Sequence, residues 1–191
     1  MKIAFFGGTF NPVHYGHVFV ANYLLELMEL DKVVFVPSGL PPHKKNCIDK
    51  NHRSNMVSLA ISGNENFSMS DYEIKKEGLS YTFDTMKHFN SKLPNDELYY
   101  IIGQDAFLLF DQWYRKDELI DLVHFIVMTR GKNMKDEITQ RYGTKNISFA
   151  DTPNIEISST DIRHRVQSGR SIKYFVSERV EEYIRQNNLY L

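Results

Sequence analysis

Two histidines, His14 and His17, stand three residues apart and follow shortly after the pair Gly7-Gly8. On a helix, residues three apart share a face, so both imidazoles would lie side by side in the first turn. The glycines let a ligand approach main-chain amides without hindrance from a Cβ atom. A helix N-terminus adds free N–H groups and a partial positive charge. Together these features predict an anion site, with phosphate as the common anion, where the imidazoles donate hydrogen bonds to a reacting phosphoryl group.

Other interpretations of this segment remain open at the level of residue types. It could be a flexible loop with surface histidines, and it matches neither the dinucleotide pattern G-x-G-x-x-G nor the P-loop pattern G-x-x-x-x-G-K-[ST]. A zinc site is a weak alternative, because two histidines at this spacing have no third ligand nearby. Gly16, between the histidines, would leave room for a flat nucleoside to lie against the helix.

A second candidate anion site lies near the C-terminal end, where residues 157–163 read I-S-S-T-D-I-R before an expected helix. Ser158 and Asp161 fit a capping box, and Ser159 is an alternative cap, so the pattern could be structural only. The functional interpretation adds Arg163, which together with hydroxyl groups and exposed amides could bind phosphate. Gly169 is expected to end this helix as its C′ residue.

The elements that must position these groups alternate along the chain. Short apolar runs predict buried strands, and apolar residues at helical spacing predict helices. Residues 38–51 form a long connection without an apolar period, as binding loops often do. The expected strands are 3–6, 33–36, 67–74, 98–102, 125–128 and 147–150, and the expected helices are 14–30, 53–61, 82–89, 134–142, 159–167 and 176–186.

This alternation predicts an α/β fold with a mostly parallel, doubly wound sheet and helices on both faces. In such sheets, ligands bind outside the carboxyl ends of the strands. We expect one domain over residues 1–191, with a small C-terminal helical part from about 159 to 191.

Composition narrows the class of protein further. The chain has 191 residues, of which 42% are hydrophobic and 25% charged, as in ordinary globular proteins. The formal net charge of −1 gives no global attraction to nucleic acid or to an anionic membrane, so we expect neither as a partner. Cys47 is the only cysteine and is expected to be an incidental thiol. No signal peptide or membrane span is visible, which predicts a cytoplasmic location.

The first segment resembles the G-G-x-F-x-P-x-H-x-G-H motif of the nucleotidyltransferase superfamily, which shares H-x-G-H with class I aminoacyl-tRNA synthetases. The C-terminal segment resembles the I-S-S-T-x-I-R element, which holds the β- and γ-phosphates of ATP in that superfamily. The resemblance implies a Rossmann-like fold and catalytic roles for His14 and His17. The ATP-binding residues that it implies are Gly7, Gly8, Thr9, Phe10, His14, His17, Ser158, Ser159, Thr160 and Arg163.

Three elements between these ends resemble the bacterial nicotinate mononucleotide adenylyltransferases: P-P-H-K at 41–44, S-Y-T-F-D-T at 80–85, and G-Q-D at 103–105 followed by Trp113. On chemistry alone, the first could be a solvated basic loop, the second a helix cap, and Trp113 a core residue. The resemblance implies that Trp113 lies flat on the pyridine ring. The mononucleotide-binding residues that it implies are Lys44, Thr82, Gly103, Asp105, Trp113, Tyr114 and Arg130.

The expected reaction is therefore adenylyl transfer from ATP to nicotinate mononucleotide, with Mg²⁺ carried by ATP and no metal held by a protein cage. Asn11 stands where Asp is common in the bacterial enzymes, and Gly131 where Pro is common. The alternatives are another adenylyl- or cytidylyltransferase such as the phosphopantetheine enzyme, a silent nucleotide sensor, and a synthetase fragment, although no K-M-S-K-S element is present. Aromatic residues near the C-terminus are compatible with a homodimer.

Overall fold

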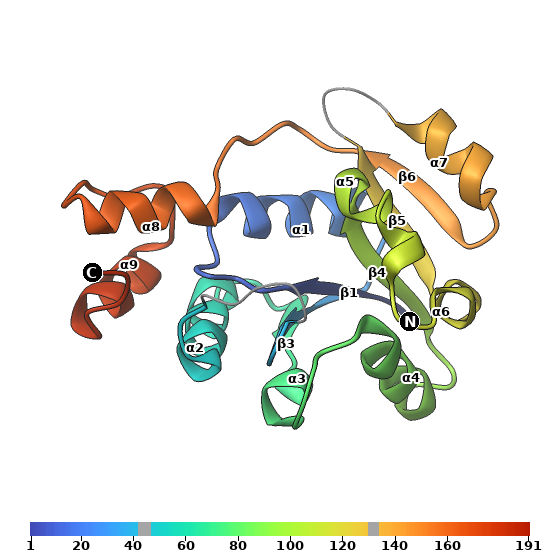
Figure 1. Ribbon diagram of the computed structural model, residues 1–191, viewed down its shortest axis with the longest axis horizontal. Coiled ribbons are helices and arrows are strands. Elements are labelled where there is room, and N and C mark those ends of the chain that lie inside the picture. Colours follow the sequence, from blue (N-terminus) through green and yellow to red (C-terminus); the bar gives the residue numbers. More distant parts are fainter. Residues whose placement is uncertain (42–46, 130–133) are drawn as a thin grey trace.

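The computed structural model describes residues 1–41, 47–129 and 134–191. Six strands, all paired in parallel, form one twisted sheet in the order β3-β2-β1-β4-β5-β6 (Figure 1). Their bounds are Lys2–Gly8 (β1), Lys32–Pro37 (β2), Phe67–Met69 (β3), Glu97–Gly103 (β4), His124–Thr129 (β5) and Ile147–Asp151 (β6).

The strand order reverses between β1 and β4. The connections before this point therefore cover one face of the sheet, and the connections after it cover the other face. A crevice therefore opens above the carboxyl ends of β1 and β4, where doubly wound sheets bind their ligands. The predicted α/β, doubly wound, Rossmann-like class is confirmed. One strand was predicted too long: after Met69 the chain turns, with Ser70 Oγ accepting from the amide of Tyr72, and the short helix α3 (Tyr72–Lys75) follows.

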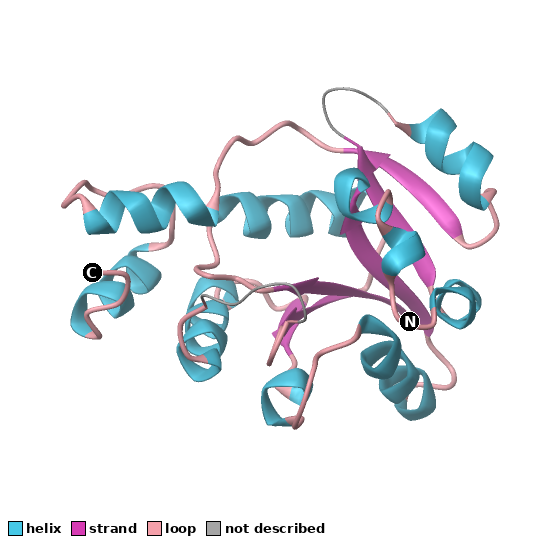
Figure 2. Cartoon of the chain, viewed as in Figure 1, coloured by secondary structure: helices cyan, strands magenta, loops and turns pink. Residues whose placement is uncertain are grey.

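Side chains that alternate along β1 face two separate apolar cores, because successive residues of a strand point to opposite faces. Ala4 and Phe6 face the core beneath α1 (Tyr15–Leu27) and α2 (Lys50–Ile61). Ile3 and Phe5 face the core beneath the helices of the other side. Figure 2 shows helices on both sides of the sheet.

The second face is covered by α4 (Thr82–Lys92), α5 (Gln104–Phe107), a 3-10 turn at Phe110–Gln112, α6 (Lys116–Leu122) and α7 (Lys135–Tyr142). The three pieces between residues 104 and 122 were not expected from the sequence. Each is too short to show a helical period, and the aromatic rings of Phe107 and Phe110, stacked 5.0 Å apart, hold them on β5.

The C-terminal helical part consists of α8 (Ser159–Gln167) and α9 (Glu178–Gln186). As expected, Gly169 is the C′ residue of α8: its φ is +67°, and its amide donates a hydrogen bond to the carbonyl of Val166. α9 packs on α2, where Tyr183 Oη bonds to His52 and Asn55, each at 2.9 Å. Both helices bury side chains in the same core as α1, and the single-domain organisation stays a prediction.

Within the described residues, no helix has the length and apolar character needed to cross a membrane.

Candidate active site

The N-terminal ends of α1 and α8 meet above the carboxyl end of β1 (Figure 1), and Ser159 Oγ donates to the carbonyl of Pro12 at 2.8 Å. Two helix N-termini therefore bring their free amides and partial positive charges to one cleft. The cleft has a volume of about 360 Å³. It is lined by Phe6, His14, Gly16, His17, Val20, Gly103, Met128, Thr152, Pro153, Ile155, Ile157, Ser158, Ser159 and Thr160.

This lining brings together residues from both ends of the sequence, as predicted for His14, His17, Ser158, Ser159 and Thr160. Met128 is the penultimate residue of β5 and Thr152 follows β6, and neither was named from the sequence. The rule that ligands bind at the carboxyl ends of strands was the signal that could have found them.

His14 and His17 stack with ring centroids 3.7 Å apart. The amide of His14 donates to Nδ1 of His17 at 3.2 Å, so that nitrogen carries no proton. In the neutral ring the proton then sits on Nε2, which makes this atom a hydrogen-bond donor. Phe10 packs edge-on against the His17 ring, with centroids 5.0 Å apart, and helps to fix its plane.

His14 is only 8% exposed, and burial lowers its pKa to about 4, so the ring is neutral near pH 7. Within the described residues, its Nδ1 is buried and has no hydrogen-bond partner. A buried nitrogen without a partner costs free energy, and such a group calls for an explanation. A Cβ atom on Gly16 would lie 3.0 Å from this nitrogen, so the glycine leaves it room.

The turn of residues 9–12 is held by hydrogen bonds that its backbone carbonyl oxygens accept. Arg53 Nη1 donates to the carbonyl of Thr9, Arg163 Nη1 to that of Asn11, and Ser159 Oγ to that of Pro12, each at 2.8 Å. In this structure Ser159 and Arg163, predicted to bind ATP, thus also connect α8 to the turn. The Phe10 side chain is 2% exposed in the core, which leaves only its backbone for the predicted ligand contact.

Arg53 of α2 was not among the site residues predicted from the sequence. Its side chain is 1% exposed, and it donates to the carbonyls of Thr9, Gly39 and Ile48 at 2.8, 3.0 and 3.2 Å. Burial lowers the pKa of its guanidinium. Arg53 therefore joins the loops that follow β1 and β2. The sequence does not reveal this role, because an arginine on a helix is ordinarily exposed and the contacts of Arg53 to Thr9 and Gly39 are to residues distant in sequence.

Ser158 is the N-cap of α8, and its hydroxyl accepts from the amide of Asp161 at 3.1 Å. The capping interpretation of this segment is therefore confirmed for Ser158. The alternative cap, Ser159, instead donates to the turn, while Thr160 Oγ1 accepts from Arg163 Nη2 at 3.2 Å. Capping and ligand binding are compatible, because all three hydroxyls line the cleft.

A second group of predicted residues gathers around the buried Tyr100 of β4. Its hydroxyl lies 3.4 Å from Thr82 Oγ1, and its ring packs edge-on with Trp113 at 6.2 Å between centroids. Tyr114, 48% exposed, packs on Tyr81 at 4.7 Å. The structure thus brings Thr82, Trp113 and Tyr114 close together and places them on the second face of the sheet. Tyr100 was not named from the sequence.

Gly103, at the end of β4, lines the histidine cleft rather than the aromatic group. Asp105 is exposed in the first turn of α5. The predicted phosphate contacts Lys44 and Arg130 lie outside the described residues.

The loop after β2 is fixed by the element at residues 80–85. Ser80 Oγ accepts from the amides of Gly39 and Leu40 at 3.0 and 3.2 Å. Thr85 Oγ1 donates to the carboxyl of Glu73 at 2.6 Å, and burial raises the pKa of that carboxyl. Part of this element therefore has a structural role, but it is not the helix cap of the alternative interpretation, because Tyr81, the N-cap of α4, makes no side-chain capping bond.

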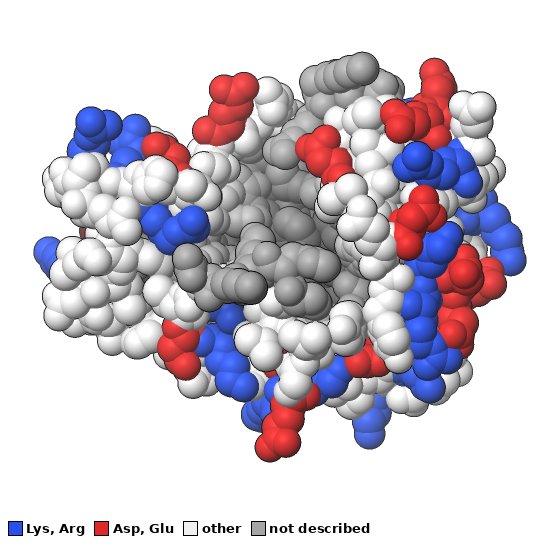
Figure 3. Space-filling model, viewed as in Figure 1, with Lys and Arg blue, Asp and Glu red and all other residues white. Residues whose placement is uncertain are grey.

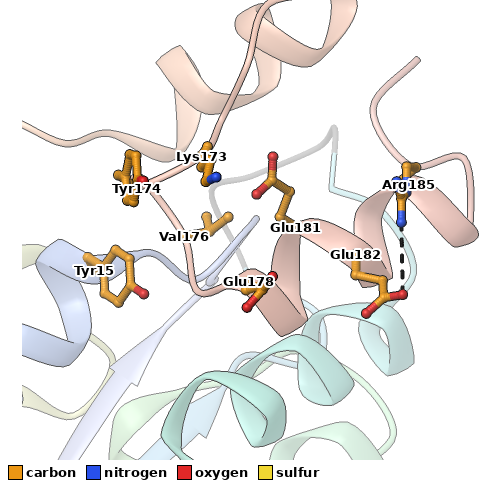
Figure 4. A pocket seen from close by; sticks show the side chains of 8 residues that line it. All are labelled: Tyr15, Lys173, Tyr174, Val176, Glu178, Glu181, Glu182 and Arg185. Carbon is orange, nitrogen blue, oxygen red and sulfur yellow. Dashed lines mark ion pairs between the residues drawn. The ribbon is translucent and has the colours of Figure 1, made fainter.

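Another cavity, of about 640 Å³, lies between the start of α1 and α9, and Figure 4 shows Tyr15 and Tyr174 on one side and the glutamates of α9 on the other. Three glutamates of α9 line it together with Lys173 and Arg185, and Arg185 pairs with Glu182 at 3.8 Å, so the cavity has charges of both signs. In the space-filling view, the charged side chains of the described residues lie mostly toward the margin of the molecule (Figure 3).

Comparison with known proteins assigns the chain to a class of enzymes. The cytidylyltransferase-like family model matches residues 5–165, which defines the chain as a nucleotidyltransferase. The "Probable nicotinate-nucleotide adenylyltransferase" of Clostridium tetani is 41% identical, covering 99% of this chain and 98% of the relative. The "Nicotinate-nucleotide adenylyltransferase" of Bacillus subtilis is 40% identical with the same two coverages. The chain belongs to the nicotinate-nucleotide adenylyltransferase family.

Solved structures agree on the fold. The Plasmodium falciparum nicotinic acid mononucleotide adenylyltransferase complexed with NaAD superposes with a TM-score of 0.85 at 23% identity, covering 99% of this chain and 97% of that one. A putative nicotinate-nucleotide adenylyltransferase of Vibrio parahaemolyticus gives a TM-score of 0.73 at 24% identity, with coverages of 96% and 98%.

Proposed function

We propose that the cleft between the starts of α1 and α8 binds ATP, with the phosphates at the two helix ends. The observation that carries this proposal is the buried Nδ1 of His14, which has no hydrogen-bond partner among the described residues, in a cleft where two helix N-termini converge. Apolar side chains of Val20, Met128 and Ile155 line the same cleft and offer a surface for the adenine ring.

The reaction is adenylyl transfer from ATP to nicotinate mononucleotide, which gives nicotinate adenine dinucleotide (deamido-NAD) and pyrophosphate in NAD biosynthesis. A 5′-phosphate oxygen of the mononucleotide attacks the α-phosphorus of ATP in line, and the bond from that phosphorus to the bridging oxygen breaks. No protein nucleophile is needed, because the attacking phosphate is already an anion. The protein contributes positioning and charge stabilisation.

In this mechanism His17 donates its Nε2–H to an α-phosphate oxygen, and the neutral His14 lies next to it. Both rings are preorganised, His17 by the amide of His14 and by Phe10. Mg²⁺, when bound with ATP, would neutralise part of the charge of the phosphates, and substrate and water would hold it. Within the described residues, no group of three His, Cys, Asp or Glu is placed to hold a metal ion.

We place the mononucleotide beside the aromatic group, with the pyridine ring on Trp113. Thr82 and backbone amides would donate to the pyridine carboxylate, which only accepts hydrogen bonds, whereas an amide would present N–H groups to these donors. Gly103 and Asp105 would lie near the ribose and Tyr114 at the edge of the pocket. Lys44 and Arg130 remain proposed contacts of the 5′-phosphate.

The first test is pyrophosphate release with ATP and Mg²⁺, comparing nicotinate mononucleotide with nicotinamide mononucleotide at equal concentration. We expect strong turnover with the acid and little with the amide. Comparable rates would keep the reaction but contradict a carboxylate-selective pocket. Absence of turnover with either acceptor would overturn the proposal and favour another phosphorylated acceptor or a silent sensor.

We also propose a homodimer formed through the outer face of α1. Tyr15 and Phe19 are 44% and 46% exposed there, and the neighbouring Tyr174 is 79% exposed. Of the C-terminal aromatic residues, Tyr174 is the one that offers a large exposed surface. Light scattering after size-exclusion chromatography should give the mass of a dimer, and Phe19→Glu should give that of a monomer. A monomeric wild type would overturn this proposal.

A further inference from the structure

The side chain of Asn11, within the turn of residues 9–12, is held by a residue from the far end of the chain. Tyr190 Oη donates to Asn11 Oδ1 at 2.9 Å, and both residues are buried, at 9% and 6% exposed. Burial raises the pKa of the Tyr190 hydroxyl, which keeps its proton for this bond. Asn11 is also one of the positions where this chain departs from the Asp common in the bacterial enzymes.

Core packing and backbone conformation hold Tyr190 in place for this contact. Leu189 and Tyr190 belong to the same buried core as Phe10, which lies within the turn, and Val13, which follows it. The backbone adopts positive φ at Asn188 and at Tyr190, 51° and 65°, which directs the chain back after α9.

A second contact from the C-terminal part reaches the start of α1. The amide of Tyr15 donates to the carbonyl of Phe175 at 2.9 Å. The segment between Asn11 and Tyr15, which leads to the proposed phosphate site, is therefore held at both ends by residues after α8.

The hydrogen bond of Tyr190 differs from the bonds that Arg53, Arg163 and Ser159 make to the turn. Tyr190 donates to a side-chain oxygen, whereas the other three donate to backbone carbonyls. The Arg163 guanidinium donates to the carbonyl of the same residue, Asn11, at 2.8 Å. Asn11 is thus held both by its side chain and by its backbone. A turn held this way presents its amides, and the histidines that follow it, in a fixed geometry, which lowers the entropy lost when a phosphate binds.

We propose that Tyr190 is a positioning residue for ATP, which acts by holding the Asn11 side chain and so the phosphate-binding turn. This inference rests on the proposed function of the cleft. The hydroxyl touches no substrate, and its effect on ATP passes through the turn. The mononucleotide is proposed to bind beside Trp113, on the other face of the sheet, so its binding should be unaffected.

The test is Tyr190→Phe, which removes the hydroxyl and keeps the ring in the core. We expect the KM for ATP to rise about fivefold, as for the loss of one buried hydrogen bond, while the KM for nicotinate mononucleotide stays unchanged. The matched control is Tyr183→Phe on α9, which removes a hydroxyl bonded to His52 and Asn55 on α2, away from the cleft. This control should leave both KM values at the wild-type level.

A double-mutant cycle separates positioning from general loss of stability. If the two side chains act through their bond, Asn11→Ala with Tyr190→Phe should raise the KM for ATP no more than Asn11→Ala alone. Equal effects of Tyr190→Phe and Tyr183→Phe, an equal rise in both KM values, or additive effects in the cycle would overturn the inference. These outcomes are distinct from failure of the proposed function, in which the wild type itself would release no pyrophosphate.

Discussion

The hydroxyl oxygen of Tyr100 lies 2.2 Å from the position that a Cβ atom on Gly7 would occupy. Gly7 is the penultimate residue of β1, at the switch point of the sheet, and Tyr100 stands on the neighbouring β4. The missing side chain of Gly7 therefore makes room for the residue that contacts Thr82 and Trp113. The pair thus joins a predicted ATP-binding residue to the aromatic group around Tyr100.

Gly7→Ala should force Tyr100 to move, because the ring is buried and has no free space. We expect a loss of stability of about 1–3 kcal/mol, as for overpacking, together with a raised KM for the mononucleotide. Combining it with Tyr100→Phe removes the atom nearest the new methyl group and should restore part of the stability. Thermal unfolding and steady-state kinetics measure both effects. A Gly7→Ala protein with wild-type stability and kinetics would contradict the steric relationship.

His17→Ala should lower kcat about a hundredfold, because the variant loses a preorganised donor to the α-phosphate. The measurement is pyrophosphate release at saturating ATP and nicotinate mononucleotide. His124→Ala is the control, since His124 is half-buried at the start of β5 and bonds to Ser148, away from the cleft. Near-normal turnover of the His17 variant would rule out the catalytic role.

His14 should make stability depend on pH. The pKa of His14 is about 4 in the folded chain, below the ordinary 6.5, because burial disfavours the charged ring. Between these values the unfolded chain binds a proton that the folded chain does not, so stability falls as the pH drops through this window. The loss is roughly 3 kcal/mol at most.

Urea unfolding of the wild type and of His14→Gln across this window measures the effect. The glutamine variant, which cannot titrate, should lose the part of the pH dependence that His14 contributes. Equal slopes of unfolding free energy against pH in the two proteins would show that His14 is not the group responsible.

Trp113→Ala should raise the KM for nicotinate mononucleotide about tenfold, because stacking of an aromatic side chain on a flat ring is lost. Trp113→Phe keeps an aromatic surface against Tyr100 and Phe110 and should lose less. The KM for ATP, measured in the same assay, is the internal control and should stay unchanged. A parallel rise in both KM values would indicate a general disturbance of the fold instead of a pyridine contact.

The sequence predicted the site best where a single segment contains both the end of a strand or the start of a helix and residues that can bind or react with a ligand. The glycine pair, the two histidines and the serines before α8 could be predicted to converge because each follows a strand or opens a helix. The structure places the histidines and the serines in one cleft, whose lining does not include Gly7 or Gly8. The same approach failed for the end of the strand predicted at 67–74, where Ser70 and Tyr72 form a turn that apolar content does not reveal.

The residues that hold the site in place could not be predicted. Arg53, Tyr100 and Tyr190 are ordinary residues in their local context, and their roles depend on partners distant in sequence. Arg53 is buried only because three carbonyls from two loops surround its guanidinium. No period or spacing in a single sequence reports such contacts.

The hydrogen bonds that hold the turn of residues 9–12 also set an order for its assembly during synthesis. The turn leaves the ribosome early, but its partners Arg53, Ser159, Arg163 and Tyr190 follow 44, 147, 152 and 179 positions after the residues they hold. Closing such long loops costs entropy that only the finished core repays. Of these four hydrogen-bonding partners, a nascent chain ending before α8 would contain Arg53 and lack the other three, so competence to bind ATP should arrive only as the final helices dock.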